Sequence, residues 1–177
     1  MIYYSSANIK VRDIEERDSI NLFMWNIDRE LYMFDPIPIP NSAENLIGYC
    51  KEFCIKFKNE IMNENHSKRK YKYFIITDDN DNAIGYVNMF GFNEENHSCE
   101  LGVIIGDKRY WNKGIGYEAV RLVMDYAFTN MNLKRIFIET GEHNINAIKL
   151  FNKLKFRKCD EYLDDDFKFI VMEKTII

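Results

Sequence analysis

The chain has 177 residues, of which 46% are hydrophobic and 29% charged, and its formal net charge is −4. This composition predicts one globular domain over residues 1–177 with a sizeable core. A nucleic-acid-binding protein normally carries a basic excess, so the mildly acidic balance argues against nucleic acid as a partner. Residues 1–4 lack the features of a signal peptide, and no apolar run is long enough to cross a membrane. We therefore expect a cytoplasmic protein with no membrane partner.

The cysteines and histidines are the residues most often used to bind transition metals, and here they show no ligand pattern. Two cysteines lie four residues apart on a predicted helix, but the histidines are scattered along the chain. The seven residues are Cys50, Cys54, Cys99, Cys159, His66, His97 and His143. We expect no metal, and reduced thiols in or near the core.

The first 60 residues predict a short strand followed by two helices. The strand covers residues 9–12, and Asp18 is expected to be the N-cap of a helical segment that reaches Ile27. Three prolines within residues 36–40 place a loop there, because proline stops a helix. Ser42 is the expected cap of the second helix. Its predicted apolar stripe consists of Leu46, Ile47, Cys50, Phe53, Cys54 and Phe57.

The rest of the chain predicts strands interrupted by two helices. A polar connection over residues 63–70 precedes three strands, at 71–76, 83–92 and 98–106, which form an antiparallel meander. A helix from Glu118 to Phe128 leads to a strand at 135–139, which should lie parallel to the strand before that helix. A helix at 144–154 and a closing strand at 167–173 complete the pattern. The predicted fold is a mixed α/β sheet flanked by helices.

The segment Lys113-Gly114-Ile115-Gly116-Tyr117-Glu118-Ala119 lies between an apolar strand and a long amphipathic helix. In this position the backbone N–H groups of a glycine turn converge, and the helix dipole adds partial positive charge. Glycine lets phosphate oxygens approach the backbone closely. The sequence therefore predicts an anion site at the start of this helix.

Two segments, residues 100–119 and 144–156, resemble the motifs of the GNAT N-acetyltransferase superfamily. The first resembles the pyrophosphate-binding motif of the branch that includes ribosomal-protein and polyamine acetyltransferases. The second resembles another signature of the family, with Asn144, Ala147, Phe151, Lys153 and Phe156 in order. The resemblance implies acetyl transfer from acetyl-CoA to a primary amine by direct attack on the thioester. It also implies a mostly antiparallel sheet with one parallel pair splayed at the acetyl-CoA site.

The resemblance assigns cofactor-binding roles to two loops and one helix. The backbone of Ile104, Ile105 and Gly106 would pair with the pantetheine arm, and one of their N–H groups would polarise the thioester carbonyl. The helix opened by Asn144 would line the other side, with Ala147 leaving room, and Phe151 and Lys153 of the same helix would also bind the cofactor. The pyrophosphate would be bound at Trp111, Asn112, Lys113, Gly114, Ile115, Gly116 and Tyr117.

The chain departs from the family pattern at three places. Trp111 replaces the usual Arg or Gln that opens the phosphate loop, and Lys155 replaces a glycine. Phe151 stands where a tyrosine often protonates the departing thiolate. Phenylalanine has no proton to donate, so that role would pass to water or to another group.

An amine acceptor needs a base, because an alkyl amine with a pKa of roughly 10 is almost fully protonated at neutral pH. Glu100, at the start of the strand that leads into the glycine turn, is the first candidate for this base. Glu139 on the neighbouring strand is the second. Trp25, Asp28 and Asp35 lie in the region that resembles the family's acceptor cleft.

The sequence leaves several alternatives open. The acceptor is a polyamine, another small amine or a peptide N-terminus, and an acidic cleft would favour a small polycation. The aspartates at 164–166 are read as a solvated turn or as an attraction for such a cation. Phe151 motivates a non-catalytic acyl-CoA-binding or sensor module as the alternative function. The resemblance also allows a homodimer, although no sequence feature marks an interface.

Overall fold

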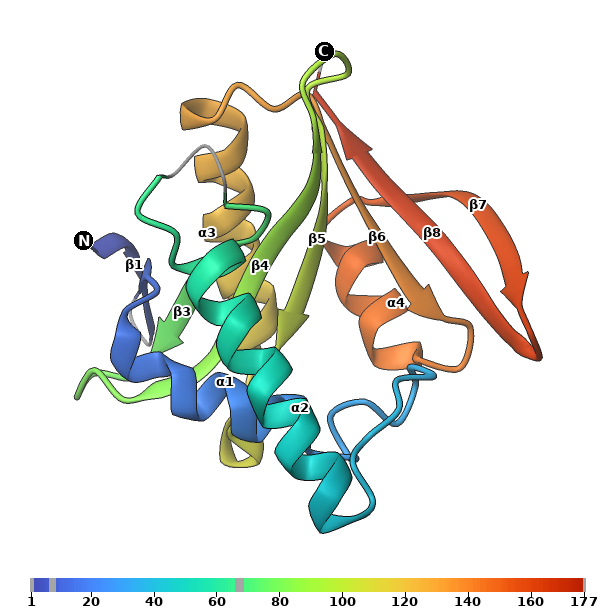
Figure 1. Cartoon of the computed structure of the whole chain (residues 1–177). Helices are drawn as coiled ribbons and strands as arrows, with labels where there is room; N and C mark the ends of the chain where they lie inside the picture. The colour runs from blue at the N-terminus through green and yellow to red at the C-terminus, as the bar shows by residue number, and fades with distance from the viewer. Residues whose placement is uncertain (1, 7–8, 66–68, 177) are drawn as a thin grey trace.

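The computed structural model describes residues 2–6, 9–65 and 69–176, which form an eight-stranded sheet in the order β1-β2-β3-β4-β5-β6-β8-β7 (Figure 1). All neighbouring strands are antiparallel except β5 and β6, which are parallel as predicted. The strands are β1 (Ile2–Ser6), β2 (Ile9–Asp13), β3 (Lys72–Thr77), β4 (Ala83–Asn93), β5 (Ser98–Ile104), β6 (Arg135–Gly141), β7 (Arg157–Asp164) and β8 (Phe167–Thr175).

Helices cover both faces of this sheet. In Figure 1, α1 (Ser19–Asn26) and α2 (Ala43–Lys56) lie in front of it, and α3 (Ile115–Asn130) lies behind. The helix α4 (Ile145–Lys153) packs beside β6, into the same core as α3. Three short elements are η1 (Glu16–Asp18), η2 (Phe57–Ile61), which is a π-helical turn continuing α2, and η4 (Lys108–Tyr110). None of the helices in the described part of the chain is long and apolar enough to span a bilayer.

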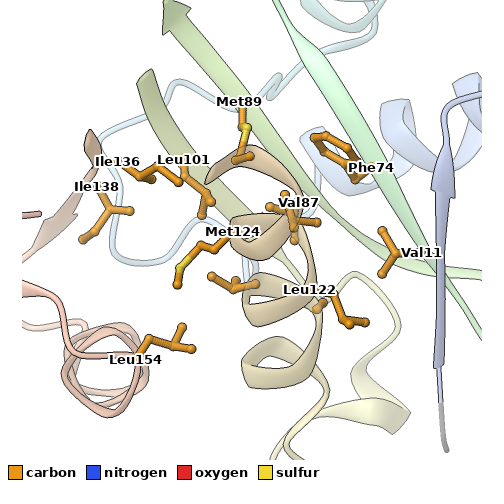
Figure 2. Packing of buried hydrophobic residues seen from close by; sticks show 14 of the residues in the cluster. Val11, Phe74, Val87, Met89, Leu101, Leu122, Met124, Ile136, Ile138 and Leu154 are labelled. Atoms are coloured by element: carbon orange, nitrogen blue, oxygen red, sulfur yellow. The ribbon is translucent and has the colours of Figure 1, made fainter. Parts of the chain in front are cut away.

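The larger core lies between the sheet and α3. Val120, Val123, Met124 and Ala127 of α3 are buried at the predicted helical spacing. They pack against alternate residues of the central strands, and Figure 2 shows Met124 among Val87, Leu101 and Ile138. Because side chains alternate across a strand, the intervening residues of β4 and β5 face α1 and α2 instead.

The apolar stripe predicted for α2 is confirmed only at Phe53 and Phe57. Its buried side is the row Phe53, Phe57 and Ile61, which continues into η2. Leu46, Ile47, Cys50 and Cys54 are exposed. Both rows fit a period of 3.6, so periodicity alone does not decide which of them faces the sheet. Cys159 is also exposed, so the expectation of core thiols is confirmed only for Cys99.

Asp18 immediately precedes α1, but its side chain does not cap the helix. The carboxylate instead accepts two hydrogen bonds of 2.8 Å from the Arg12 guanidinium and is only 2% exposed. Ser42 does cap α2 as predicted, because its hydroxyl accepts a hydrogen bond from the N–H of Asn45.

Two strands were absent from the sequence-based prediction. The short β1 pairs with β2, and β7 forms the sheet edge next to β8. Every residue of β7 is exposed, which explains why its sequence lacks the alternation of a half-buried strand. Residues 66–68, in the middle of the predicted connection, lie outside the described residues, and so does His66. In the described ranges, no group of three or more histidine, cysteine, aspartate or glutamate side chains is placed to hold a metal ion.

Candidate functional site

The parallel strands β5 and β6 separate halfway along their length. They are paired from Ser98 and Arg135 to Glu100 and Phe137, where the pairing ends. Beyond this point β5 continues to Ile104 and β6 to Gly141, so that they diverge. Among the described residues, no strand pairs with this part of β5 on the side of β6. The predicted splayed pair is thus present, with an open backbone edge along it.

The glycine turn lies at the end of β5 and opens α3. Asn112 and Gly114 have positive φ angles of 58° and 78°, and Gly114 is the N-cap residue with no side-chain cap. Within the described residues, no hydrogen bond satisfies the backbone N–H groups of residues 112–114. The first N–H groups of α3 are also free because no helical turn precedes them. The turn therefore has the conformation and the free donors of an anion site.

The start of α3, directly after the turn, packs against α4. A Cβ atom added to Gly116 would lie 3.7 Å from the side chain of Leu150 on α4. The Lys153 ammonium lies 4.3 Å from the centre of the Tyr117 ring, and Lys113 is exposed. The structure thus brings together Gly116, Tyr117 and Lys153, which the sequence assigned to one site from two motifs.

The segment that joins β5 to the glycine turn is fixed by two tryptophans. The Trp111 indole N–H donates a 2.7 Å hydrogen bond to the carbonyl of Ile105. A Cβ atom added to Gly106 would fall 2.1 Å from the Trp25 ring, so only glycine fits there. These contacts position Ile104, Ile105 and Gly106 at the open edge of β5, while Trp25 is buried under the loop.

The second motif forms the N-terminus and the buried face of α4. Asn144 is the N-cap, and its side chain accepts a hydrogen bond from the N–H of Ala147. The Phe151 ring is 3% exposed and packs edge to face on Phe156, with a distance of 5.0 Å between ring centres. Phe151 is therefore a core residue.

Glu100 is the last residue of β5 that pairs with β6, and it faces the α1 and α2 side of the sheet. Burial raises its pKa to about 7, and the charge of Glu139 contributes to the same shift. No cation in the described residues forms a salt bridge with either carboxylate. Glu100 is therefore a carboxylate that can bind or release a proton near neutral pH.

Tyr162 is a residue of this site that sequence reasoning missed. Its hydroxyl donates a 2.6 Å hydrogen bond to Glu139, and its ring stacks on Phe169 of β8. It lies on β7, the strand whose exposed residues gave no pattern. The aspartates that follow stand in and beside the turn between β7 and β8, and all three are exposed. This agrees with the reading of residues 164–166 as a solvated turn.

Aromatic side chains line the α1 and α2 side of the sheet, the face that also carries Glu100. Tyr73 and Tyr86 are buried with their ring centres 5.1 Å apart, and the Tyr32 hydroxyl lies 3.3 Å from that of Tyr86. Burial raises the pKa of Asp35, whereas Asp28 is paired with Lys108 at 2.8 Å. Of the two aspartates assigned to this region, Asp28 forms a salt bridge, and Asp35 forms none with the residues that the structure describes.

The loop after α1 reaches across to the end of β6. A Cβ atom added to Gly141 would lie 2.7 Å from the carbonyl oxygen of Phe34 and 2.8 Å from the ring of Phe167. This contact closes one end of the region between the diverging strands. Asp35, the next residue of the loop, consequently lies near the end of β6, the strand that carries Glu139.

A family model described as an acetyltransferase (GNAT) domain matches residues 8–157. The chain is 35% identical over 158 residues to the N-acetyltransferase p20 of Bacillus licheniformis, covering 89% of this chain and 82% of that one. It is 31% identical over 94 residues to the spermidine N(1)-acetyltransferase of Escherichia coli K12, covering 53% and 50% of the two chains.

Among solved structures, a similar fold is found in the spermidine N-acetyltransferase from Vibrio cholerae, determined in complex with CoA and spermine. The TM-score is 0.78 at 20% identity, and the match covers 96% of both chains. At this level of identity the match shows a shared fold.

Proposed function

Because the chain belongs to the GNAT acetyltransferase family, we propose that it transfers the acetyl group of acetyl-CoA to a primary amine of a small polycation. The observation that carries this proposal is the divergence of β5 and β6 at Glu100. One end of the resulting gap carries the free N–H groups of the glycine turn, and its other face carries acidic and aromatic side chains. The two features suit a pyrophosphate and a cation, respectively.

The residues present fit acetyl-CoA. The N–H groups of the turn from Trp111 to Tyr117 would bind the pyrophosphate, with Lys113 and Lys153 adding positive charge. The open edge of β5 at Ile104, Ile105 and Gly106 would pair with the pantetheine arm. Asn144 and Ala147 on the first turn of α4 would line the opposite side of the gap. Bound acetyl-CoA supplies an activated acetyl group on a thiol leaving group.

Glu100 is the proposed general base. Its carboxylate would accept a proton from the ammonium group of the acceptor, and the neutral nitrogen would then attack the thioester carbonyl carbon. A backbone N–H at the end of β5 would stabilise the oxyanion. The C–S bond would break as the thiolate departs, and the attacking nitrogen would release its second proton to water to give the neutral amide. Phe151 has no proton to donate and is buried, so the thiolate would leave without it or with a proton from water. A thiol pKa of about 8.5 makes this departure feasible.

The face of the sheet covered by α1 and α2, here called the acceptor side, carries negative charge. This charge favours a polycation over a peptide N-terminus as the acceptor. Glu100, Glu139 and Asp35 supply carboxylates there, and neighbouring tyrosine rings offer cation–π contacts. Spermidine is the substrate named for the Escherichia coli relative, and the Vibrio cholerae structure contains spermine. We therefore propose the polyamine class for this chain.

The first test is incubation with acetyl-CoA and a panel of amines, followed by mass spectrometry of the products. The panel contains spermidine, diamines, aminoglycosides, amino acids and short peptides with free N-termini. We expect mono-acetylated polyamine as the main product. If only peptides were acetylated, the acceptor would be a peptide N-terminus and not a polyamine. Binding of acetyl-CoA without any product would favour the alternative of an acyl-CoA-binding module.

The second test is the Glu100→Gln variant, assayed from pH 6 to pH 10 with the best amine of the panel. We expect the rate to fall at least tenfold at pH 7 and much less at pH 10, where the amine loses its own proton. Glu16→Gln, on the exposed turn before α1, is the matched control and should leave the rate unchanged. An equal loss at both pH values would assign the base elsewhere.

Three further expectations belong with this proposal. We propose that residues 1–177 act as one domain, which the continuous sheet from β1 to β7 supports. The cysteines of the described residues are free thiols, which suits the reducing cytoplasm. The homodimer allowed by the resemblance stays a prediction, and the mass of the native protein in solution would test it.

A further inference from the structure

The strands β6 and β7, with β8 between them, carry a tyrosine–glutamate hydrogen bond on the face of the sheet that also carries Glu100. Glu139 lies two residues beyond Phe137, the partner of Glu100 in the parallel pair. Side chains two residues apart on a strand share a face. Glu139 therefore points to the same face of the sheet as Phe137 and Glu100, the acceptor side. It is opposite Val171 of β8, whereas Tyr162 on β7 is opposite Phe169.

The Tyr162 side chain reaches across β8, and its hydroxyl donates a hydrogen bond of 2.6 Å to Glu139 on β6. The ring is held in place because it stacks on Phe169, with 5.1 Å between ring centres and 17° between their planes. Partial desolvation by its neighbours and the hydrogen bond to Glu139 raise the pKa of Tyr162, so it remains a donor throughout the neutral range. The contact therefore fixes one carboxylate of the acceptor side without neutralising its charge.

We propose that Glu139 and Tyr162 are positioning residues for acetyl transfer: the Tyr162 hydroxyl holds the Glu139 carboxylate on the face that carries Glu100, and that fixed negative charge favours transfer of the amine proton to Glu100. This inference rests on the proposed function, in which Glu100 takes the proton of the amine. It assigns to the edge strand β7 a part in the chemistry, which the exposed, patternless sequence of that strand did not suggest.

The other groups around Glu100 do not supply this charge. Arg135, whose guanidinium stacks on the Phe137 ring, is paired with Glu173 at 2.6 Å. Across β4, the residue opposite Glu100 is Phe90, and beyond it the Lys56 ammonium lies over the Tyr71 ring.

The two titratable neighbours on β5 and β7 are neutral near pH 7. Burial raises the pKa of Cys99 to about 12, and that of Tyr162 is raised as well. The charge of Asp164, at the end of β7, contributes to the raised pKa of Tyr162. It does not contribute to the raised pKa of Glu100. Glu139 is thus the charge that acts on Glu100 in the described part of the chain.

The test is a carbon-13 titration of the Glu100 carboxyl group in the free protein, with the signal assigned by its loss in Glu100→Gln. We expect Glu139→Gln to shift the midpoint to lower pH by roughly 0.5 to 1 unit, because a like charge is removed. Tyr162→Phe should shift it in the same direction by less, because the carboxylate loses its fixed position. The acid limb of the kcat/KM profile should move with the midpoint in both variants.

Glu161→Gln is the matched control, because Glu161 is the neighbour of Tyr162 on β7 but pairs with Lys168 and Lys158. Its Glu100 midpoint should equal that of the wild type. A wild-type midpoint in either Glu139→Gln or Tyr162→Phe would overturn the inference. If the midpoints shift as expected but Glu100→Gln keeps the full rate at pH 7, the base assigned in the proposed function fails instead.

Discussion

Two features of its surroundings change the acidity of Glu100: the side chain is partly buried, and the charge of a second carboxylate, Glu139, acts on it. These features raise its pKa from an ordinary 4.5 to about 7, which means that the folded protein holds the proton more tightly than the unfolded chain. The stabilisation linked to this proton is full below about pH 4.5 and is lost as pH rises through 7. Ionised Glu100 therefore costs stability above neutral pH.

We expect Glu100→Gln to be more stable than the wild type at pH 8, by roughly 1 to 2 kcal/mol after allowing for solvent screening. At pH 4.5 the two proteins should differ little, since both then carry an uncharged side chain. Urea unfolding at the two pH values measures the difference. A gain in stability that is the same at both would mean that packing, and not ionisation, distinguishes the two side chains.

Phe151 illustrates how a family position can acquire a different role in one chain. Its ring is 3% exposed and belongs to the core between α4 and the sheet. In Phe151→Tyr the added hydroxyl would be buried, at a cost of about 1 to 3 kcal/mol unless it finds a partner. We expect a lower urea midpoint and an unchanged kcat. A several-fold increase in kcat would show instead that this position reaches the thiolate.

At the scale of elements, the turn between β5 and α3 depends on two glycines for different reasons. Gly114 adopts a φ of 78° with open space around it, whereas Gly116 faces Leu150 across the gap. Gly114→Glu and Gly116→Glu should each weaken acetyl-CoA binding at least tenfold, because a carboxylate repels phosphate and blocks the approach to the backbone. Isothermal titration calorimetry measures the affinity.

Two controls separate charge from strain in this experiment. Gly48→Glu adds the same carboxylate on α2, where nothing lies within 4 Å, and should bind like the wild type. Gly114→Asn keeps a residue that tolerates positive φ and adds no charge, so it should retain most of the affinity. Wild-type affinity in both glutamate variants would exclude the turn as the pyrophosphate site.

The elements differ in how far the sequence determines them. The parallel pair β5 and β6 and the buried row of α3 were predictable, because the helical crossover and the 3.6-residue period admit one solution. The inward face of α2 was not, since two rows of apolar residues fit the same period. The edge strand β7 was missed because all of its residues face solvent, and Tyr162 was missed with it.

The residues of the candidate site likewise include some that the sequence predicts and one that it does not. Gly116, Tyr117 and Lys153 come together because motifs with fixed spacing place them on α3 and α4. The distance between Tyr162 and Glu139 depends on the order of three strands, which local patterns do not encode. A side chain brought in by a neighbouring strand is visible only once the sheet is assembled.

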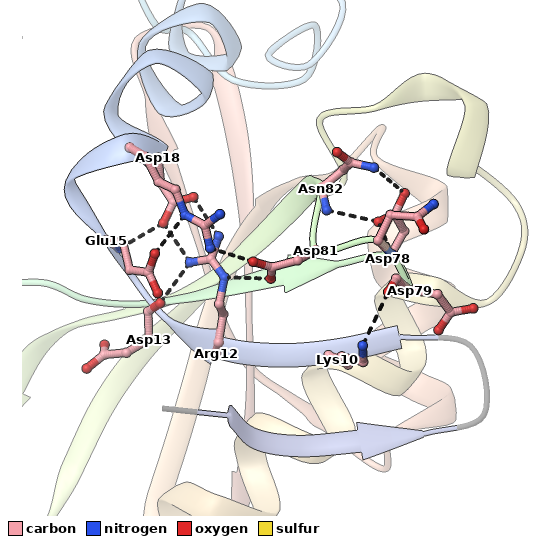
Figure 3. A network of polar contacts seen from close by, with 11 residues as sticks. Lys10, Arg12, Asp13, Glu15, Asp18, Asp78, Asp79, Asp81 and Asn82 are labelled. Carbon is pink, nitrogen blue, oxygen red and sulfur yellow. Dashed lines mark hydrogen bonds and ion pairs between the residues drawn. The ribbon is translucent and has the colours of Figure 1, made fainter.

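On the scale of the whole molecule, a buried ion pair joins the N-terminal strands to the rest of the sheet. Figure 3 shows Arg12 of β2 between Asp18 at the start of α1 and Asp81 in the turn before β4. Arg12 is 4% exposed and Asp18 is 2% exposed. Hydrogen bonds to Asp18 are the main cause that raises the pKa of Arg12, so the guanidinium stays charged in the folded protein.

Removing one partner of this pair leaves a charge buried without compensation, which is the costly case for an ion pair. We therefore expect Asp18→Ala to lower the free energy of unfolding by about 3 kcal/mol, measured by urea denaturation at pH 7. Asp81→Asn is the control: Asp81 is 45% exposed in its side chain and has a φ of 63°, which asparagine tolerates. Its loss should be below about 1 kcal/mol. Equal losses of unfolding free energy would mean that the exposed partner Asp81 contributes as much stability as the buried partner Asp18. The larger loss in Asp18→Ala would show that burial of the pair connects α1, and with it Trp25 under Gly106, to the strands that carry the site.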